Sequence, residues 1–221
     1  MNVANGKEVR IKGDDVTLIG DLALHRGAKG IVLFAHGSGS SRHSTRNKYV
    51  ASVLRSHGLS TLLLDLLTEE ESERTDKRFD IDLLAKRLTI AEKWLKEQEE
   101  TKDLAIGYFG ASTGAAAALQ SAAGLGDEIK AIVSRGGRPD LAKDYLAKVT
   151  APTLLIVGGF DEEVIALNDK AYMKLIAEKK MEIVPGATHL FEEQGTLEQV
   201  AELAARWFVE YLGIPKETTN P

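Results

Sequence analysis

One stretch decides the fold of this chain: Leu104-Ala-Ile-Gly-Tyr-Phe-Gly-Ala-Ser112-Thr-Gly-Ala-Ala-Ala-Ala-Leu-Gln120. It begins with an apolar run and ends in alanine-rich sequence, which has high helix propensity. The stretch therefore predicts a strand, a sharp turn and a helix, with G-x-S-x-G at the turn, as in a nucleophile elbow. Glycine two residues before and after Ser112 keeps the turn free of neighbouring side chains. The helix that follows offers N–H groups and a positive dipole end, which suit an oxyanion.

G-x-S-x-G is short, and a glycine-rich loop before an alanine-rich helix can match it by chance. The order of the other elements is therefore needed. Apolar runs predict buried strands at 31–35, 61–66, 131–133, 153–157 and 181–184, and helical patterns lie at 47–56, 84–95, 163–178 and 197–211. Residues 8–11 and 16–24 predict an antiparallel hairpin at one edge. Together they predict an α/β fold, a mainly parallel sheet of about eight strands with helices on both faces.

Length and composition narrow the class of protein. The 221 residues, 43% of them hydrophobic, predict a single domain over 1–215 with a loose tail at 216–221 and no large lid domain, since 68–80 is the only candidate cover. The net charge of −5 argues against a nucleic-acid partner, and the lack of cysteine excludes disulfides and a thiol nucleophile. No apolar run approaches the roughly 20 residues of a membrane span, and the first residues lack an apolar signal core. We expect a cytoplasmic protein without a membrane partner.

A serine hydroxyl needs a base to take its proton and an acid to orient that base. In hydrolases with a nucleophile elbow these follow in the order Ser, acid, His. Asp161 follows the strand at 153–157 and His189 follows the strand at 181–184, and His189 is the one histidine of five that lies beyond Ser112. The alternatives are a surface histidine at 189 and a helix N-cap role for Asp161. The other acids that could replace Asp161 are Glu162, Glu163 and Asp140.

A tetrahedral intermediate needs two N–H donors. We expect one from Thr113 and one from the loop His36-Gly37-Ser38-Gly39, with Ser38 preferred over Gly39. His36 itself is expected to brace the loop. A nucleotide-binding loop is the rival interpretation, but Arg42 stands where the third glycine of G-x-G-x-x-G should be, and the chain has no P-loop motif.

Four arginines lie on loops at the predicted active edge: Arg42, Arg46, Arg135 and Arg138. A guanidinium fork suits a substrate carboxylate, so Arg42 and Arg135 are candidate substrate-binding residues. The alternative, which we favour, is that these arginines pair with acids such as Asp65, Asp80 or Asp140 and hold the loops.

The motifs resemble the alpha/beta-hydrolase superfamily, and its dienelactone hydrolase-like branch in particular. The resemblance is carried by FAHGSGSSR at 34–42, GYFGASTG at 107–114, VSRGGRPDL at 133–141, PTLLIVGG at 152–159 with Asp161, and HLFE at 189–192. It implies that Ser112 is the nucleophile, His189 the base and Asp161 the orienting acid. The namesake enzymes use a cysteine nucleophile and carry a glutamate in the loop after the third strand. Ser112 and His36-Gly37-Ser38 stand at these places, which argues against dienelactone as the substrate.

We expect a serine hydrolase that cleaves small carboxylic esters, thioesters or lactones through an acyl-enzyme on Ser112, in an open pocket and with no cofactor or metal. Two alternatives remain open. One is a hydrolase-fold binding or scaffold protein with little turnover, natural or engineered. The other is an acyltransferase that passes the acyl group to an acceptor other than water. The sequence does not choose between a monomer and a homodimer.

Overall fold

The computed structural model describes residues 6–13 and 15–213, so the predicted tail at 216–221 lies outside the described residues. One eight-stranded sheet has the order β1-β2-β4-β3-β5-β6-β7-β8. Its strands are β1 (Lys7–Lys12), β2 (Thr17–Ala23), β3 (Gly30–Ala35), β4 (Ser60–Leu64), β5 (Ala105–Ala111), β6 (Ile129–Arg135), β7 (Thr153–Gly158) and β8 (Lys179–Val184). β2 pairs antiparallel with β1 and β4, and all other pairs are parallel. This confirms the mainly parallel sheet and the edge hairpin.

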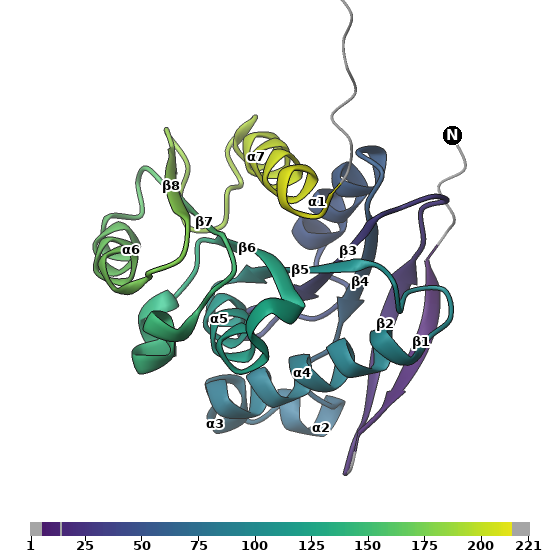
Figure 1. Cartoon of the computed structure of the whole chain (residues 1–221). Coiled ribbons are helices and arrows are strands. Elements are labelled where there is room, and N and C mark those ends of the chain that lie inside the picture. The colour runs from purple at the N-terminus through teal and green to yellow at the C-terminus, as the bar shows by residue number, and fades with distance from the viewer. Residues whose placement is uncertain (1–5, 14, 214–221) are drawn as a thin grey trace, which may run out of the picture.

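Helices cover both faces of the sheet, as predicted (Figure 1). On one face lie α1 (Thr45–Ser56) and α7 (Thr196–Tyr211), and on the other lie α4 (Ile81–Glu97), α5 (Thr113–Leu125) and α6 (Glu162–Lys174). Each face has its own hydrophobic core, one containing Phe34, Phe109 and Phe208 and the other containing Leu33 and Tyr108. The central strands are buried on both sides, which explains their continuous apolar runs.

The alanine run of α5 has a packing reason. Ala115 to Ala118 are fully buried, between the sheet and the helices on that face. A Cβ added at Gly114 would lie 2.2 Å from the carbonyl oxygen of Ala35, and one at Gly110 would lie 2.4 Å from Cα of Ala115. Since real Cβ atoms do not approach so closely, small residues are required for α5 to lie this near the sheet.

Residues 68–80, the candidate cover, contain two short helices, α2 (Glu69–Ser72) and α3 (Thr75–Arg78). α2 begins with a capping box, in which Thr68 and Glu71 each accept the other's backbone N–H. Glu71 also accepts a hydrogen bond of 2.9 Å from Arg87, which is 4% exposed. Glu71 is therefore a structural anchor rather than part of a solvated face. A further segment, η2 (Pro139–Lys148), is a 3-10 helix with a kink at Lys143, in a stretch for which no element was predicted.

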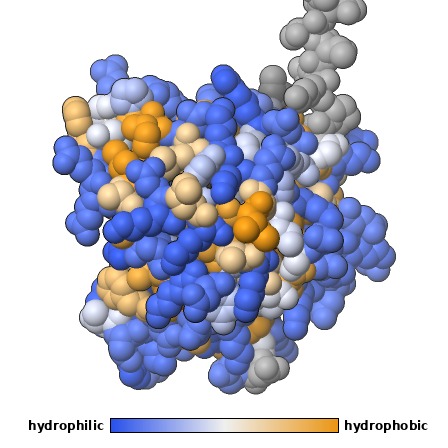
Figure 2. Space-filling model, turned by 60° about the vertical axis from the view of Figure 1, so that its left-hand side comes forward, coloured by the Kyte–Doolittle hydropathy of each residue, from blue (hydrophilic) through white to orange (hydrophobic). Residues whose placement is uncertain are grey.

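The surface on the side of Figure 2 is mostly hydrophilic, with hydrophobic groups in small separate patches. Within residues 6–13 and 15–213, no helix combines the length and the apolar character that crossing a membrane requires.

Candidate active site

Ser112 occupies the predicted elbow. It lies between the end of β5 at Ala111 and the start of α5 at Thr113, with φ 51° and ψ −121°. Positive φ is rare for a residue with a side chain and costs about 1–3 kcal/mol, so the packing around it must hold it in place. The close contacts of Gly110 and Gly114 described above supply that packing.

His189 and Asp161 form a direct pair. The Nδ1 atom of His189 lies 2.6 Å from Oδ2 of Asp161, and the two side chains are 38% and 15% exposed. Asp161 precedes α6 at the N-cap position, yet its side chain makes no capping bond to the helix. Its carboxylate is thus directed to the histidine, which favours the orienting role over the N-cap alternative.

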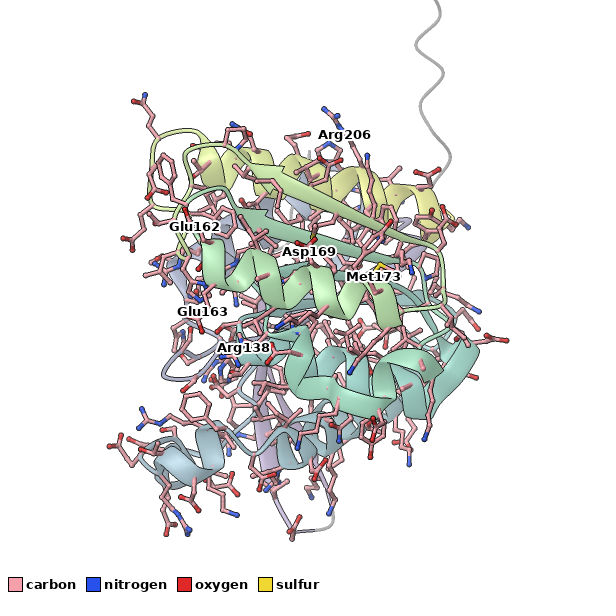
Figure 3. All side chains as sticks on the ribbon, turned by 90° about the vertical axis from the view of Figure 1, so that its left-hand side faces the viewer. Arg138, Glu162, Glu163, Asp169, Met173 and Arg206 are labelled. Atoms are coloured by element: carbon pink, nitrogen blue, oxygen red, sulfur yellow. The ribbon has the colours of Figure 1, made fainter. Side chains whose placement is uncertain are left out.

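The three acids that could have replaced Asp161 are placed elsewhere. Glu162 and Glu163 are exposed in the first turn of α6, and Figure 3 labels both at the end of that helix. Asp140 accepts two hydrogen bonds of 2.9 Å from Arg138. Among the four candidates, Asp161 is the one that contacts His189 in this structure.

Residues 135–138 connect Ser112 to His189. The N–H of Ser112 donates to the carbonyl of Arg135 at 3.3 Å, and the N–H of Arg138 donates to the carbonyl of Ser112 at 3.0 Å. Gly136, with φ 51°, lies against the histidine, since a Cβ there would be 3.0 Å from the His189 carbonyl oxygen and 3.6 Å from Cε1. One short loop therefore contacts the nucleophile on one side and the base on the other.

A buried hydrogen bond joins the loop at 135–138 to α6. Asn168, fully buried on α6, donates from Nδ2 to the carbonyl of Gly137 at 3.0 Å. Gly137 has no room for a side chain, because a Cβ would lie 1.9 Å from Oγ of Ser134. Sequence reasoning did not single out Asn168 or Gly137. The glycine pair directly after a buried strand was the available signal for a close approach of the backbone.

The two residues predicted to supply the oxyanion donors, Ser38 and Thr113, contact each other. Gly37 is pressed against the elbow, because a Cβ there would lie 2.9 Å from Cβ of Ser112. The next residue, Ser38, donates its N–H to Oγ1 of Thr113 at 2.9 Å, and Thr113 is 2% exposed. The loop after β3 thus meets the start of α5 beside the nucleophile, and the Ser38 N–H is bound to the threonine hydroxyl.

His36 braces that loop, as expected. Its Nε2 accepts the N–H of Leu66 at 3.1 Å, which leaves Nδ1 to donate to the carbonyl of Gly37 at 3.0 Å. The ring is 7% exposed. Burial lowers the pKa of His36 below its ordinary value and outweighs the opposite effects of the Gly37 hydrogen bond and the Asp65 charge.

The side chain of Arg42 forms ion pairs with three carboxylates. Its guanidinium contacts Asp65 at 2.5 Å, Glu8 at 3.0 Å and Asp21 at 3.3 Å. Its backbone N–H also donates to Asp65, at 2.7 Å. This geometry supports the loop-holding alternative over a substrate-binding role.

Arg135 is buried and makes no ion pair with the residues that the structure describes. It is 6% exposed and donates to Oδ1 of Asn47 at 3.3 Å, with its guanidinium 5.9 Å from the ring centre of Phe191. Burial, with a smaller effect from Arg46, lowers the pKa of Arg135 to about 10. A direct role of Arg135 in substrate binding stays a prediction.

A cavity of about 560 Å³ opens beside Ser38. It extends from the loop after β3 to α2 and α3. On the side of that loop it is lined by Gly37, which contacts Ser112. Its lining is mostly polar and comprises His36, Gly37, Ser38, Gly39, Ser40, Ser41, His43, Ser44, Leu67, Ser72, Glu73, Arg78 and Leu84. No group of three or more metal-binding side chains occurs within 6–13 and 15–213.

Comparison with known proteins identifies the family. The pattern of the dienelactone hydrolase family matches residues 27–213. The crystal structure of a dienelactone hydrolase from Anabaena variabilis is 54% identical, with a TM-score of 0.90, over 95% of this chain and 100% of that one. Est1E from Butyrivibrio proteoclasticus is 18% identical with a TM-score of 0.79, over 95% of this chain and 100% of that one, and shares the fold.

A protein of Mycobacterium tuberculosis, provisionally named a phosphoribosyl transferase, is 55% identical over 206 residues, which are 93% of this chain. The chain spans 46% of the length of that relative. The family match covers most of the chain, and the Anabaena structure superposes along its whole length. The chain therefore belongs to the dienelactone hydrolase family and has the fold of its hydrolases.

Proposed function

We propose that this protein is a serine hydrolase that cleaves small carboxylic esters, thioesters or lactones, with Ser112, His189 and Asp161 as its catalytic triad. The observation that carries the proposal is the 2.6 Å contact of His189 with Asp161, held by a loop that also binds the backbone of Ser112. A strained serine, a partly buried carboxylate and an imidazole, in this chain order, are what acyl transfer to serine requires.

In this mechanism Nε2 of His189 takes the proton of Ser112 as Oγ attacks the substrate carbonyl. Asp161 holds the ring through Nδ1 and stabilises the imidazolium that forms. The imidazolium then protonates the leaving group, which departs and leaves an acyl-enzyme. Water, deprotonated by His189, cleaves the acyl-enzyme and restores the serine.

The cavity beside Ser38 supports small, polar substrates. Serine hydroxyls, one arginine and one glutamate line it, with only two leucines. Such a lining offers more hydrogen-bonding surface than apolar surface, so it favours short acyl groups over long ones. The short helices α2 and α3 form its outer wall, in place of a lid domain.

The name of the Mycobacterium tuberculosis relative does not change this proposal. This chain corresponds to less than half of that protein, so a transferase activity can reside in the part that has no counterpart here. The matched part is the one with the hydrolase pattern. We therefore assign the hydrolase chemistry to the region shared by the two proteins.

Labelling with a fluorophosphonate probe tests the proposal. Wild type should be labelled at Ser112, and Ser112→Ala and His189→Ala should abolish labelling, while Ser52→Ala, an exposed serine on α1, should not. A folded wild type that is not labelled would leave a hydrolase-fold binding protein as the better interpretation. Product analysis with p-nitrophenyl acetate, with and without added alcohol, then separates hydrolysis from acyl transfer.

A further inference from the structure

The hydroxyl of Thr113 occupies an unexpected place beside the nucleophile. It accepts the N–H of Ser38 at 2.9 Å, and that N–H is the donor expected to face the oxyanion. The contact is enforced by the packing of the loop, because Gly37 lies directly against Ser112. The residue that should supply the first oxyanion donor thus holds the second one with its own side chain.

A threonine hydroxyl accepts and donates at the same time. Oγ1 of Thr113 accepts from Ser38, and it donates to no acceptor among the residues that the structure describes. Thr113 is 2% exposed, so water does not readily satisfy this proton, and leaving a buried polar group without a partner is unfavourable. A hydrogen bond accepted by a hydroxyl also strengthens the bond that it donates. The hydroxyl is therefore a polarised donor next to Ser112.

We propose that Thr113 supplies two donors to the oxyanion, its backbone N–H and its Oγ1–H, with the Ser38 N–H behind the hydroxyl as its support. The inference rests on the proposed serine hydrolase function. As Oγ of Ser112 bonds to the carbonyl carbon, its proton moves to His189 and the carbonyl π electrons move to the oxygen. The two Thr113 donors bind that negative oxygen. When the bond to the leaving group breaks, the electrons return and the carbonyl of the acyl-enzyme forms.

The backbone supports this assignment. Thr113 is the first residue of α5, so its N–H belongs to the first turn and has no partner within the helix. The β-branched side chain has few rotamers, which keeps the hydroxyl in place without further loss of entropy. Both donors are thus fixed before the substrate binds, as electrostatic stabilisation of a transition state requires.

The competing interpretation is that Ser38 donates directly to the oxyanion and the Thr113 hydroxyl moves aside. Thr113→Val separates the two, because valine keeps the branched shape and removes the hydroxyl. If Ser38 is the direct donor, this change frees its N–H and activity is retained. If the hydroxyl is the donor, activity is lost although the Ser38 N–H is free.

The experiment compares wild type with Thr113→Val, Thr113→Ala and Thr113→Ser. For each variant we would measure kcat and KM with p-nitrophenyl acetate, the inhibition constant of phenylboronic acid, and the melting temperature. Phenylboronic acid is used because its adduct with serine is tetrahedral and negatively charged, as the reaction intermediate is. The control is Thr101→Val, since Thr101 is also fully buried and donates to a backbone carbonyl, that of Leu95, ahead of the opposite end of β5. It should lower stability and leave kcat unchanged.

We expect Thr113→Val and Thr113→Ala to lower kcat about 10²- to 10³-fold with KM within about threefold of wild type, as for loss of one oxyanion donor. The inhibition constant should rise by a similar factor, and Thr113→Ser should keep kcat within about tenfold. A Thr113→Val or Thr113→Ala enzyme with kcat within about threefold of wild type would overturn the inference in favour of Ser38. A loss of kcat without a weaker boronic acid would reduce Thr113 to a loop-holding residue and also overturn it. A wild type that neither hydrolyses the ester nor reacts with fluorophosphonate would instead overturn the proposed function, and this inference with it.

Discussion

The loops after β3 and β8 both carry a histidine at the same edge of the sheet, and the two rings are used differently. His36 has both nitrogens bound to the backbone, at Gly37 and Leu66, and is 7% exposed. His189 has Nδ1 bound to a carboxylate, makes no hydrogen bond through Nε2 to the residues that the structure describes, and has a side chain that is 38% exposed.

The difference shows what separates a structural imidazole from one suited to acid–base chemistry. His36 cannot take a proton without breaking the bond to the Leu66 N–H, because two donors would then face each other. His189 can take a proton on Nε2 while Asp161 balances the charge. His36 fixes the loop beside Ser112, whereas His189 has the arrangement that the proposed function requires of a base.

Removing the carboxylate of Asp161 should have the largest effect of these changes, and the effect should be on kcat. Asp161→Asn keeps the shape of the side chain but loses the charge and favours the wrong tautomer of His189, so kcat should fall about 10³- to 10⁴-fold. The rate of ester hydrolysis measures this, with Glu162→Gln, the exposed neighbour on α6, as the control. Equal activity of Asp161→Asn and wild type would mean that another acid orients His189.

The corresponding change at His36 should affect stability first. His36→Ala removes two buried hydrogen bonds and leaves the Leu66 N–H without its partner, so the free energy of unfolding should fall by about 2–4 kcal/mol. Urea unfolding measures it, and His43→Ala, an exposed histidine of the same loop, should change little. Unchanged stability in His36→Ala would show that Arg42 alone holds the loop.

The lowered pKa of His36 predicts a pH dependence of stability. Between that lowered pKa and about 6.5, the unfolded chain binds more protons than the folded one, so the free energy of unfolding falls as the pH decreases below about 6.5. The slope from this residue is at most about 1.4 kcal/mol per pH unit. Urea unfolding at pH 7.5, 6.5 and 5.5 should show a smaller decrease in His36→Gln than in wild type. Identical slopes would contradict this account.

Substitution of Arg42 should have the smallest effect on stability, because Arg42 holds the same loop from the surface. Arg42→Gln removes a partly exposed cluster with Asp65, Asp21 and Glu8, so stability should fall by about 1 kcal/mol, and less at high salt. KM for a neutral ester should not change. Arg74→Gln, which breaks an exposed pair with Asp76, is the control and should have no measurable effect on stability. A large rise in KM for Arg42→Gln would restore its substrate-binding role.

The fold could be predicted from the sequence because its signals are local. The apolar runs, the G-x-S-x-G turn and the order Ser112, Asp161, His189 each depend on residues near one another or on chain order. The capping box at Thr68 and Glu71 was also a readable local signal, and it was missed because the acidic run around it is typical of a solvated surface.

The contacts that join distant segments could not be predicted. Arg42 meets Glu8 and Asp21, and Asn168 meets Gly137, through pairings that depend on how β1, β2 and α6 are placed by the whole sheet. A polar residue inside an amphipathic helix gives no sign of the carbonyl that it will reach. The bond between Ser38 and Thr113 belongs to the same class, since it exists only because Gly37 allows two loops to touch.

The positive φ of Ser112 has a consequence for how thermally robust this protein can be. Glycine adopts this backbone conformation without strain, so Ser112→Gly should relieve part of the roughly 1–3 kcal/mol held at the elbow. For a chain of this size, each kcal/mol corresponds to about 2–4 °C in melting temperature. A thermal melt should therefore show the variant to be more heat-resistant than wild type. A more heat-resistant Ser112→Gly would mean that the wild-type chain gives up stability to keep a hydroxyl at the elbow, as the proposed function requires.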